Sequence, residues 1–264
     1  RTARPCQDKI RESDGSVDMG KITVVGIGPG SLEDMTPRAK RAIEEAAVVA
    51  GYTTYIKLIK DLIGEREVIG TGMMQEIDRC RMAVETAAKG RDTVVVSSGD
   101  SGVYGMAGLV LELLLQREAG DRPEFGGVIA GISAVNAAAS ILGAPLMHDF
   151  AVISLSDLLT PWELIKKRAA AAAEADFVVA LYNPKSKKRV QNIEEIREIF
   201  LACRAADTPV GIVNHAAREA ESKTISTLEN FTKETIDMFS LVIIGNSRTY
   251  VKEGYMITPR GYEV

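Results

Sequence analysis

Short apolar runs alternate with stretches of helical periodicity through the first half of the chain. Five of these runs are predicted to be strands, at 22–26, 47–51, 67–70, 93–98 and 127–130. Helices are predicted to begin at Pro37 and near Thr53, Gln75 and Tyr104. The pair Thr36-Pro37 has the residue types preferred at an N-cap and at the first helical position. Runs such as TVVVSS show no apolar–polar alternation, which indicates burial on both faces and a mostly parallel sheet between helices.

The second half continues this alternation less regularly. Strands are predicted at 151–155, 177–182, 209–214, 223–227 and 241–245, with a final strand in the stretch YMITPRGY (255–262). Helices are predicted near 161–174 and 187–204. The strands at 223–227 and 254–258 lack a long helix on one side, so this second sheet is predicted to be mixed.

Between the halves, a helix of small residues passes into a Gly/Pro turn at 131–150. We place the domain boundary in this turn, which predicts an α/β fold with an N-terminal domain at 21–145 and a C-terminal domain at 146–264. Residues 1–20 are predicted to be a disordered leader. Residues 1–18 are polar and lack the apolar segment of a secretory signal, and Met19 is a candidate natural start.

Composition narrows the function classes. The 264 residues are 46% hydrophobic and 26% charged with a net charge of -4, which argues against a broad nucleic-acid surface. No apolar run approaches the roughly 18–20 residues of a membrane span. Cys6, Cys80 and Cys203 are isolated, and neither His148 nor His215 lies at ligand spacing from them. We therefore expect a cytoplasmic protein with no disulfide framework, no protein-bound metal, and no membrane or nucleic-acid partner.

The stretch ITVVGIGPGS (22–31) has the form of a strand followed by a glycine turn, and a nucleotide site is one interpretation. The dinucleotide fingerprint G-x-G-x-x-G is not met, because Ser31 stands at the third glycine position. Pro29 removes a backbone N–H that a pyrophosphate site would use. The next predicted strand ends in VVAGY without the carboxylate that binds a ribose. An NAD site is therefore rejected, whereas a tight turn without a ligand stays open.

Two later turns favour a ligand site. VVVSSGDSGVYGMAG (94–108) is a strand that ends in glycines around Asp100, and AGISAVNAAAS (130–140) is a small-residue turn after the next strand. Open α/β sheets place ligands at the carboxyl ends of their strands. A single carboxylate among exposed backbone groups suits a neutral or cationic ligand better than a phosphate.

The three turns carry a family resemblance. G-x-G-P-G at 26–30, S-G-D-x-x-x-Y-G at 98–105 and G-I-S-A at 131–134 resemble the tetrapyrrole (class III) S-adenosylmethionine-dependent methyltransferases. Four further stretches are similar to the C17-methyltransferases of cobalamin biosynthesis: ISLSDLLTPW (153–162), LYNPKSKKR (181–189), GIVNHAARE (211–219) and VIIGNSRTY (242–250). The resemblance implies methylation of precorrin-3B or cobalt-factor III at C17 with ring contraction. It also implies S-adenosylmethionine as donor, S-adenosylhomocysteine as product, an active site in the cleft between the domains, and a homodimer.

The resemblance further implies which residues bind the two ligands. The donor contacts by position are Pro29, Ser98, Gly99, Asp100, Val103, Ser133, Ala134, Tyr182, Ala216 and Gly245. The carboxylates of the substrate are expected to meet Lys185, Lys187, Lys188 and Arg218, with Arg248 as a further candidate. Lys187, Lys188 and Arg189 fall in the first turn of a predicted helix, where cations oppose the helix dipole unless they meet an anion. A solvated charged face is the alternative for this cluster.

Ring contraction requires proton transfers, and the sequence offers few candidates for a general acid or base. His148, beside Asp149 at the predicted domain junction, is the first, with a surface or capping histidine as the alternative. Asp100 is the second, with a turn carboxylate that bonds its own backbone as the alternative. Tyr104 and Ser97 are weaker candidates.

Two departures from the family pattern keep other functions open. The usual G-D-P turn is Gly99-Asp100-Ser101 here, and Ala216-Ala217 stand near an expected glycine. A protein that binds the donor or a corrinoid without turnover would be compatible with both changes. A family member that acts on another tetrapyrrole carbon, or on a substrate of another kind, is the second alternative.

Overall fold

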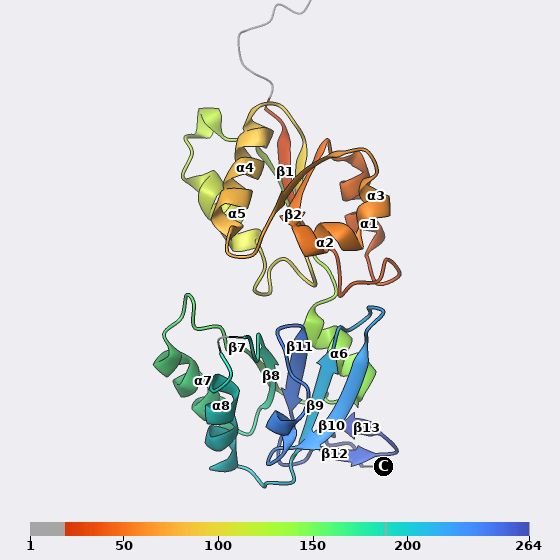
Figure 1. Cartoon of the computed structure of the whole chain (residues 1–264), viewed down its shortest axis with the longest axis vertical. Coiled ribbons are helices and arrows are strands. Elements are labelled where there is room, and N and C mark those ends of the chain that lie inside the picture. Colours follow the sequence, from red (N-terminus) through yellow and green to blue (C-terminus); the bar gives the residue numbers. More distant parts are fainter. Residues whose placement is uncertain (1–18, 188, 264) are drawn as a thin grey trace, which may run out of the picture.

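A computed structural model describes residues 19–187 and 189–263, which form two halves that each contain a five-stranded sheet (Figure 1). The predicted leader at 1–18 and the predicted substrate residue Lys188 lie outside the described residues. The α/β class with two sheets is confirmed.

The first sheet is parallel throughout, with the strand order β3-β2-β4-β1-β5. Its strands are β1 (Lys21–Gly26), β2 (Val48–Tyr52), β3 (Glu67–Thr71), β4 (Thr93–Ser97) and β5 (Glu124–Ile129). All five runs predicted to be strands are therefore strands. Because they share one direction, the loops that follow them meet at a single edge of the sheet.

Helices cover both faces of this sheet, as the unbroken apolar strands predict. One face packs on α4 (Glu76–Ala88) and α5 (Ala107–Leu115), and the other on α1 (Pro37–Glu45), α2 (Thr53–Leu58) and α3 (Lys60–Ile63). The hydroxyl of Thr36 accepts a hydrogen bond from the backbone N–H of Ala39 at 3.1 Å, which confirms the predicted N-cap. α5 begins later than predicted, because Tyr104 has φ 54°, a left-handed conformation that a helix does not contain.

The second sheet is mixed, as predicted, with the strand order β10-β9-β11-β8-β7. Its strands are β7 (Phe150–Ser154), β8 (Val178–Tyr182), β9 (Pro209–Asn214), β10 (Ser222–Thr227) and β11 (Ser240–Ile244). β7 is parallel to β8, whereas β11 is antiparallel to both β8 and β9. The carboxyl ends of β7, β8 and β9 therefore share one edge, and the carboxyl end of β11 lies at the opposite edge.

The prediction of a helix over 187–204 was wrong at its start. α8 begins at Asn192 and runs to Leu201, so Lys187 and Arg189 lie in the loop before it. Arg189 donates to the carbonyls of Leu155 at 2.6 Å and Asn183 at 3.2 Å, and these bonds hold the chain in a loop. Lys187 and Arg189 therefore do not oppose a helix dipole.

Helix α6 (Ala134–Leu142) bears on the predicted domain boundary at 145/146. Its buried side chains, among them Val135, Ala138 and Leu142, pack with Val213 and Ile243 of β9 and β11. α6 thus covers the second sheet on the face opposite α7 (Trp162–Glu174) and α8, as Figure 1 shows. This packing favours a division between β5 and α6, ahead of the predicted one, and the division into domains stays a prediction.

The predicted final strand is short and belongs to a third, small sheet. β13 (Tyr255–Ile257) pairs with β12 (Tyr250–Lys252) and with β6 (Gly143–Ala144), and it does not join the second sheet. Pro259 and Gly261 follow, and neither residue type favours continuation of a strand.

Leu142→Ala tests the packing of α6 on the second sheet. Leu142 is fully buried at the end of α6, so its truncation should lower the free energy of unfolding by about 2–5 kcal/mol. Leu115→Ala is the control, since Leu115 is 64% exposed and its truncation should cost less than about 0.5 kcal/mol. Urea unfolding followed by circular dichroism measures both. Equal stability of the two variants would contradict the packing described for α6.

Candidate active site between the two halves

Three glycine turns touch at the carboxyl edge of the first sheet. The backbones of Gly28 and Gly99 exchange two hydrogen bonds, of 3.1 and 2.7 Å, which join the turn after β1 to the turn after β4. A Cβ atom on Gly26 would lie 2.7 Å from the carbonyl oxygen of Gly99 and 2.8 Å from the nitrogen of Gly131, in the turn after β5. These contacts are with backbone atoms, so only glycine fits and the three turns are held together.

Asp100 links the second turn to the third. Its Oδ1 accepts from the backbone N–H of Gly102 at 2.8 Å, and its Oδ2 accepts from the backbone N–H of Gly131 at 3.0 Å. The first bond is that of a turn carboxylate to its own backbone, which was the alternative to a catalytic role. The second fixes Asp100 against the turn after β5. The contacts thus give Asp100 a positioning role, and its catalytic role stays a prediction.

Two tyrosines connect this edge to the second half. Tyr104 donates from its hydroxyl to the carbonyl of Val152 in β7 at 3.1 Å, and its ring centroid lies 5.2 Å from that of Tyr182. The hydroxyl of Tyr182, at the end of β8, accepts from the N–H of Val135 at 3.0 Å. Burial raises the pKa of both tyrosines above the usual value, so both hydroxyls keep their protons near neutral pH.

Arg218 makes a second connection between the halves. It lies in the loop between β9 and β10, and it donates to the carbonyl of Pro29 at 3.0 Å and to the hydroxyl of Ser98 at 3.1 Å. Burial lowers its pKa, although an arginine stays charged at any physiological pH. Within the described residues it forms no ion pair with a carboxylate, so this half-buried cation has only neutral acceptors.

Most of the predicted donor contacts come together at this place. Ser133 and Ala134 lie next to Gly99, since a Cβ on Gly99 would be 3.7 and 3.5 Å from their backbone atoms. Ala216 and Tyr182 pack against the cluster that contains the buried side chains of α6. The residues gathered here are Pro29, Ser98, Gly99, Asp100, Val103, Ser133, Ala134, Tyr182, Ala216 and Arg218. Lys185 and Lys187 lie in the loop after β8, on the same edge of the second sheet.

His148 and Gly245 do not join them, and both predictions need correction. The backbone N–H of Val178, at the amino end of β8, donates to the carbonyl of Asp149, so His148 precedes β7 at the far edge of the second sheet. A strand rises about 3.3 Å per residue, which places this edge about 13 Å from the end of β7 at Ser154. Gly245 also lies at the far edge, because β11 runs antiparallel and the N–H of Gly245 donates to the carbonyl of Pro209. Arg248 follows Gly245 on that side.

Two further residues near the site were not predicted from the sequence. Tyr55, on α2 after β2, has a pKa raised by burial and lies in the field of Arg218 and Arg79. Arg79 on α4 is 3% exposed, and it donates to the hydroxyl of Thr71 at 2.6 Å and to the sulfur of Met106 at 3.6 Å. The position of Tyr55 after a parallel strand could have indicated it. An arginine within an amphipathic helix carries no such signal.

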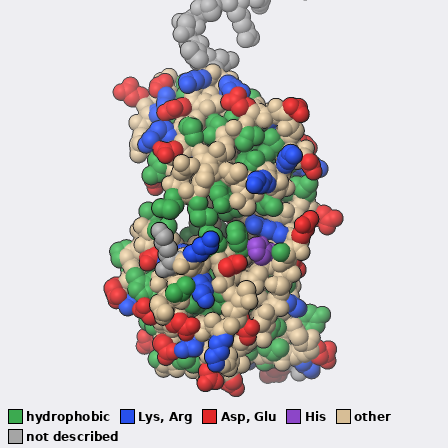
Figure 2. Space-filling model, viewed as in Figure 1, with side chains coloured by type: hydrophobic (Ala, Val, Ile, Leu, Met, Phe, Trp, Pro, Cys, Tyr) green, Lys and Arg blue, Asp and Glu red, His purple; other side chains and the backbone are tan. Residues whose placement is uncertain are grey.

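Figure 2 shows the surface hollowed between the two halves, with hydrophobic side chains along the hollow and Lys or Arg side chains below it.

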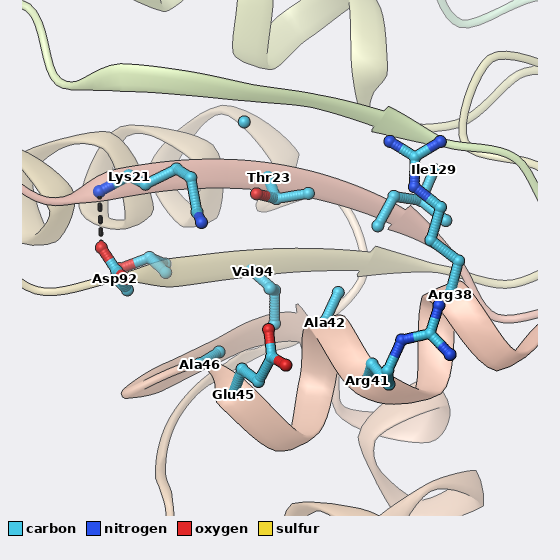
Figure 3. Close-up of a pocket in the computed structure, with 12 residues that line it drawn as sticks. Lys21, Thr23, Arg38, Arg41, Ala42, Glu45, Ala46, Asp92, Val94 and Ile129 are labelled. Atoms are coloured by element: carbon cyan, nitrogen blue, oxygen red, sulfur yellow. Dashed lines mark hydrogen bonds between the residues drawn. The ribbon is translucent and has the colours of Figure 1, made fainter.

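Two cavities lie elsewhere. One, of about 210 Å³, lies between α1 and the face of the first sheet over β1, β4 and β5, where Figure 3 shows Lys21, Arg38, Arg41, Glu45 and Asp92 around it. The other, of about 510 Å³, is lined by residues such as Pro209, Ile225 and Val251. Neither is lined by the glycine turns.

In 19–187 and 189–263, no three His, Cys, Asp or Glu side chains are grouped so that they could hold a metal ion. Over the same residues, every helix is too short or too polar to cross a membrane.

The fold and the site define an α/β protein with two five-stranded sheets, in which the glycine turns at the carboxyl edge of the first sheet face the second half. The chain belongs to the tetrapyrrole (corrin/porphyrin) methylase family, which it matches over residues 21–232. It is 51% identical over 247 residues to the cobalt-factor III methyltransferase of Priestia megaterium, covering 92% of this chain and 45% of that protein. It is also 51% identical over 241 residues to the probable cobalt-factor III C(17)-methyltransferase of Salmonella typhimurium, covering 91% and 99%.

A solved structure agrees with this membership. The methyltransferase CobJ superposes with a TM-score of 0.84 at 36% sequence identity, covering 91% of this chain and 100% of that one. The chain spans less than half the length of the Priestia megaterium relative but nearly all of the Salmonella typhimurium protein. The resemblance inferred from the turn motifs is thus confirmed at the level of the family.

Gly26→Ala tests the contact between the turns. The added methyl would press on the Gly99 and Gly131 backbones, and overpacking of this kind should lower the free energy of unfolding by about 1–3 kcal/mol. In Gly108→Ala, the methyl meets nothing within 4 Å and lies in α5, so stability should be unchanged or higher by up to about 1 kcal/mol. Urea denaturation compares the two variants. Wild-type stability of Gly26→Ala would refute the close approach.

Proposed function

We propose that this protein transfers a methyl group from S-adenosylmethionine to C17 of a cobalt-factor III or precorrin-3B macrocycle, with ring contraction, in cobalamin biosynthesis. The observation that carries the proposal is the 51% identity, over nearly the whole chain, to relatives named as a cobalt-factor III methyltransferase and a probable cobalt-factor III C(17)-methyltransferase. The glycine turns and their partners across the cleft supply the site that such a reaction needs.

The methyl donor fits the edge formed by the three turns. A Cβ at Gly26 or Gly131 would collide with backbone there, so these positions leave the backbone itself as the wall of the site. Pro29 offers no N–H to a phosphate, and the neighbouring carboxylate of Asp100 favours a cation over an anion. When bound, S-adenosylmethionine supplies an electrophilic methyl group on a positively charged sulfonium. Tyr182 and Ala216 would close the donor site from the second half.

The contribution of the protein is alignment and exclusion of water. Asp100 fixes the second and third turns, and Arg218 and Tyr104 fix the second half against them. Such constraints hold two reactants in one geometry, which can remove a large part of an activation barrier. The chain therefore need supply little chemistry of its own for methyl transfer.

The macrocycle carries several carboxylates, and cations at the cleft suit them. Arg218 is a half-buried cation whose described acceptors are neutral, so a substrate carboxylate would add the missing counter-charge. Lys185 and Lys187 follow β8 on the same edge. Their roles, and that of Lys188, are proposals of the same kind.

For the proton transfers of ring contraction, we propose Tyr104 in place of His148. The Tyr104 hydroxyl lies at the cleft and is kept protonated, whereas His148 lies at the far edge of the second sheet. The left-handed backbone of Tyr104 supports this choice. A bulky residue in that conformation is strained and is kept only where the surrounding structure requires it. A homodimer in the cytoplasm, without nucleic-acid or membrane partners, remains part of the proposal.

Ligand binding and product analysis test the proposed function. Calorimetry should find micromolar affinity for S-adenosylhomocysteine and no heat with NAD, because the first turn lacks a pyrophosphate cradle. Incubation with donor and either cobalt-factor III or precorrin-3B should raise the product mass by one methyl group and shift the absorbance. The substrate that turns over identifies the oxygen-independent or the oxygen-dependent route. Binding of NAD in place of S-adenosylhomocysteine would refute the proposal.

Arg218→Ala tests the substrate role of the arginine. Loss of a charge-assisted bond of about 1.5–3 kcal/mol should raise the KM for the macrocycle roughly 10–100-fold. Arg218→Lys should recover only part of this, because a lysine cannot reproduce the planar fork that bonds two acceptors. The matched control is Arg248→Ala, at the far edge, which should leave KM unchanged. Equal KM values for Arg218→Ala and Arg248→Ala would remove Arg218 from the substrate site.

A further inference from the structure

The loop between β7 and α7 exposes two adjacent leucines. Leu158 is 69% exposed and Leu159 is 99% exposed, the latter fully in contact with solvent. The loop follows the carboxyl end of β7, so it lies at the edge of the second sheet that carries Tyr182. In Figure 1 it rises from the lower half toward the upper half. Paired exposed leucines beside a ligand edge indicate a contact surface.

The base of this loop is fixed while its tip is free. Leu155 is buried, and its backbone N–H donates to the carbonyl of Tyr182 at 2.9 Å. Arg189 donates to the carbonyl of Leu155 at 2.6 Å, and its Nε lies 3.5 Å from Oδ1 of Asp157. These bonds explain why Arg189 does not serve as a free cation for the substrate. They hold Leu158 and Leu159 out from a rigid support.

Arg189 also joins this loop to the loop that follows β8. It donates to the carbonyl of Asn183 at 3.2 Å, and the amide of Asn183 donates to the hydroxyl of Ser154 at 3.0 Å. Lys185 and Lys187 belong to the second of these loops. The loop that carries the leucines and the loop that carries the lysines are therefore bonded to each other at their bases, and Leu155 of the first bonds Tyr182.

We propose that Leu158 and Leu159 form an apolar lid that packs on one face of the tetrapyrrole ring. The inference rests on the proposed function, and it names how that substrate is held. A flat apolar ring rimmed with carboxylates matches exposed leucines on one loop and lysines on the loop bonded to it. Ring binding would remove both leucines from water, which is the driving force expected for such a lid.

The fluorescence of Trp162 can report binding of the ring beside this loop. Trp162 is the only tryptophan of the chain and lies at the start of α7, where its Nε1 donates to Oε2 of Glu195 at 3.0 Å. A bound tetrapyrrole absorbs the emission of a nearby tryptophan, so quenching reports binding beside the loop. Cobalt-factor III is titrated into the full chain with S-adenosylhomocysteine present, using wild type, Leu159→Ser and the double variant Leu158→Ser/Leu159→Ser.

Leu159→Ser should weaken cobalt-factor III binding about tenfold, and the double variant more, because each loses the burial of a leucine side chain. The affinity for S-adenosylhomocysteine, measured by calorimetry, should stay within about twofold of wild type. The matched control is Leu115→Ser, which removes a leucine that is 64% exposed at the end of α5 and should bind like wild type. All three positions are on the surface, so folding is preserved.

Three outcomes overturn the inference. Wild-type affinity of the double variant for cobalt-factor III would show that the leucines do not touch the ring, and the proposed function would stand. A change in oligomeric state on size-exclusion chromatography, with ring affinity unchanged, would assign them to a contact between copies. Failure of the wild-type protein to bind cobalt-factor III or precorrin-3B would refute the proposed function itself, and the lid with it.

Discussion

The site depends on the contact of three backbone turns at one edge of the first sheet. Gly26, Gly99 and Gly131 come so close that a side chain on Gly26 or Gly131 would collide with backbone atoms. A parallel sheet brings the ends of its strands to one edge, but it does not by itself bring their loops into contact. The two hydrogen bonds between Gly28 and Gly99, and the two accepted by Asp100, set that contact. The result is a wall of backbone, which suits a ligand recognised by shape more than by phosphate charge.

The second half completes the site because of the directions of its strands. β7, β8 and β9 point their carboxyl ends toward the turns, and each is followed by a loop with a candidate role. Tyr104 and Arg218 then connect the halves through hydrogen bonds between residues distant in sequence. α6 packs on the second sheet although it directly follows the last strand of the first, so it ties the third turn to the second half.

The local parts of this structure could be predicted from sequence. The strands of the first sheet follow from short apolar runs, unbroken in β1 and β4, and the start of α1 follows from Thr36 and Pro37. The three turns were recognisable because glycines and an acid follow successive strands. The predictions that were wrong concerned residues whose places depend on strand direction and long-range contacts. Gly245 was expected at the cleft from the family resemblance, but the strand that precedes it is antiparallel to its neighbours, so Gly245 lies at the far edge. His148 was expected there because it lies beside Asp149 at the predicted domain junction, but this segment lies at the far edge of the second sheet. The cations after β8 were wrongly placed in a helix. Arg189 bonds the carbonyls of two loops, and these long-range contacts could not be predicted from the sequence.

The most direct measurement is a crystal structure of the protein with S-adenosylhomocysteine. The ligand should lie at the first sheet's carboxyl edge, in contact with the turns that contain Gly28, Gly99 and Gly131, with Tyr182 and Ala216 on its other side. Ligand bound instead in the cavity between α1 and the face of the first sheet, or at the far edge of the second sheet beside Gly245, would contradict this placement.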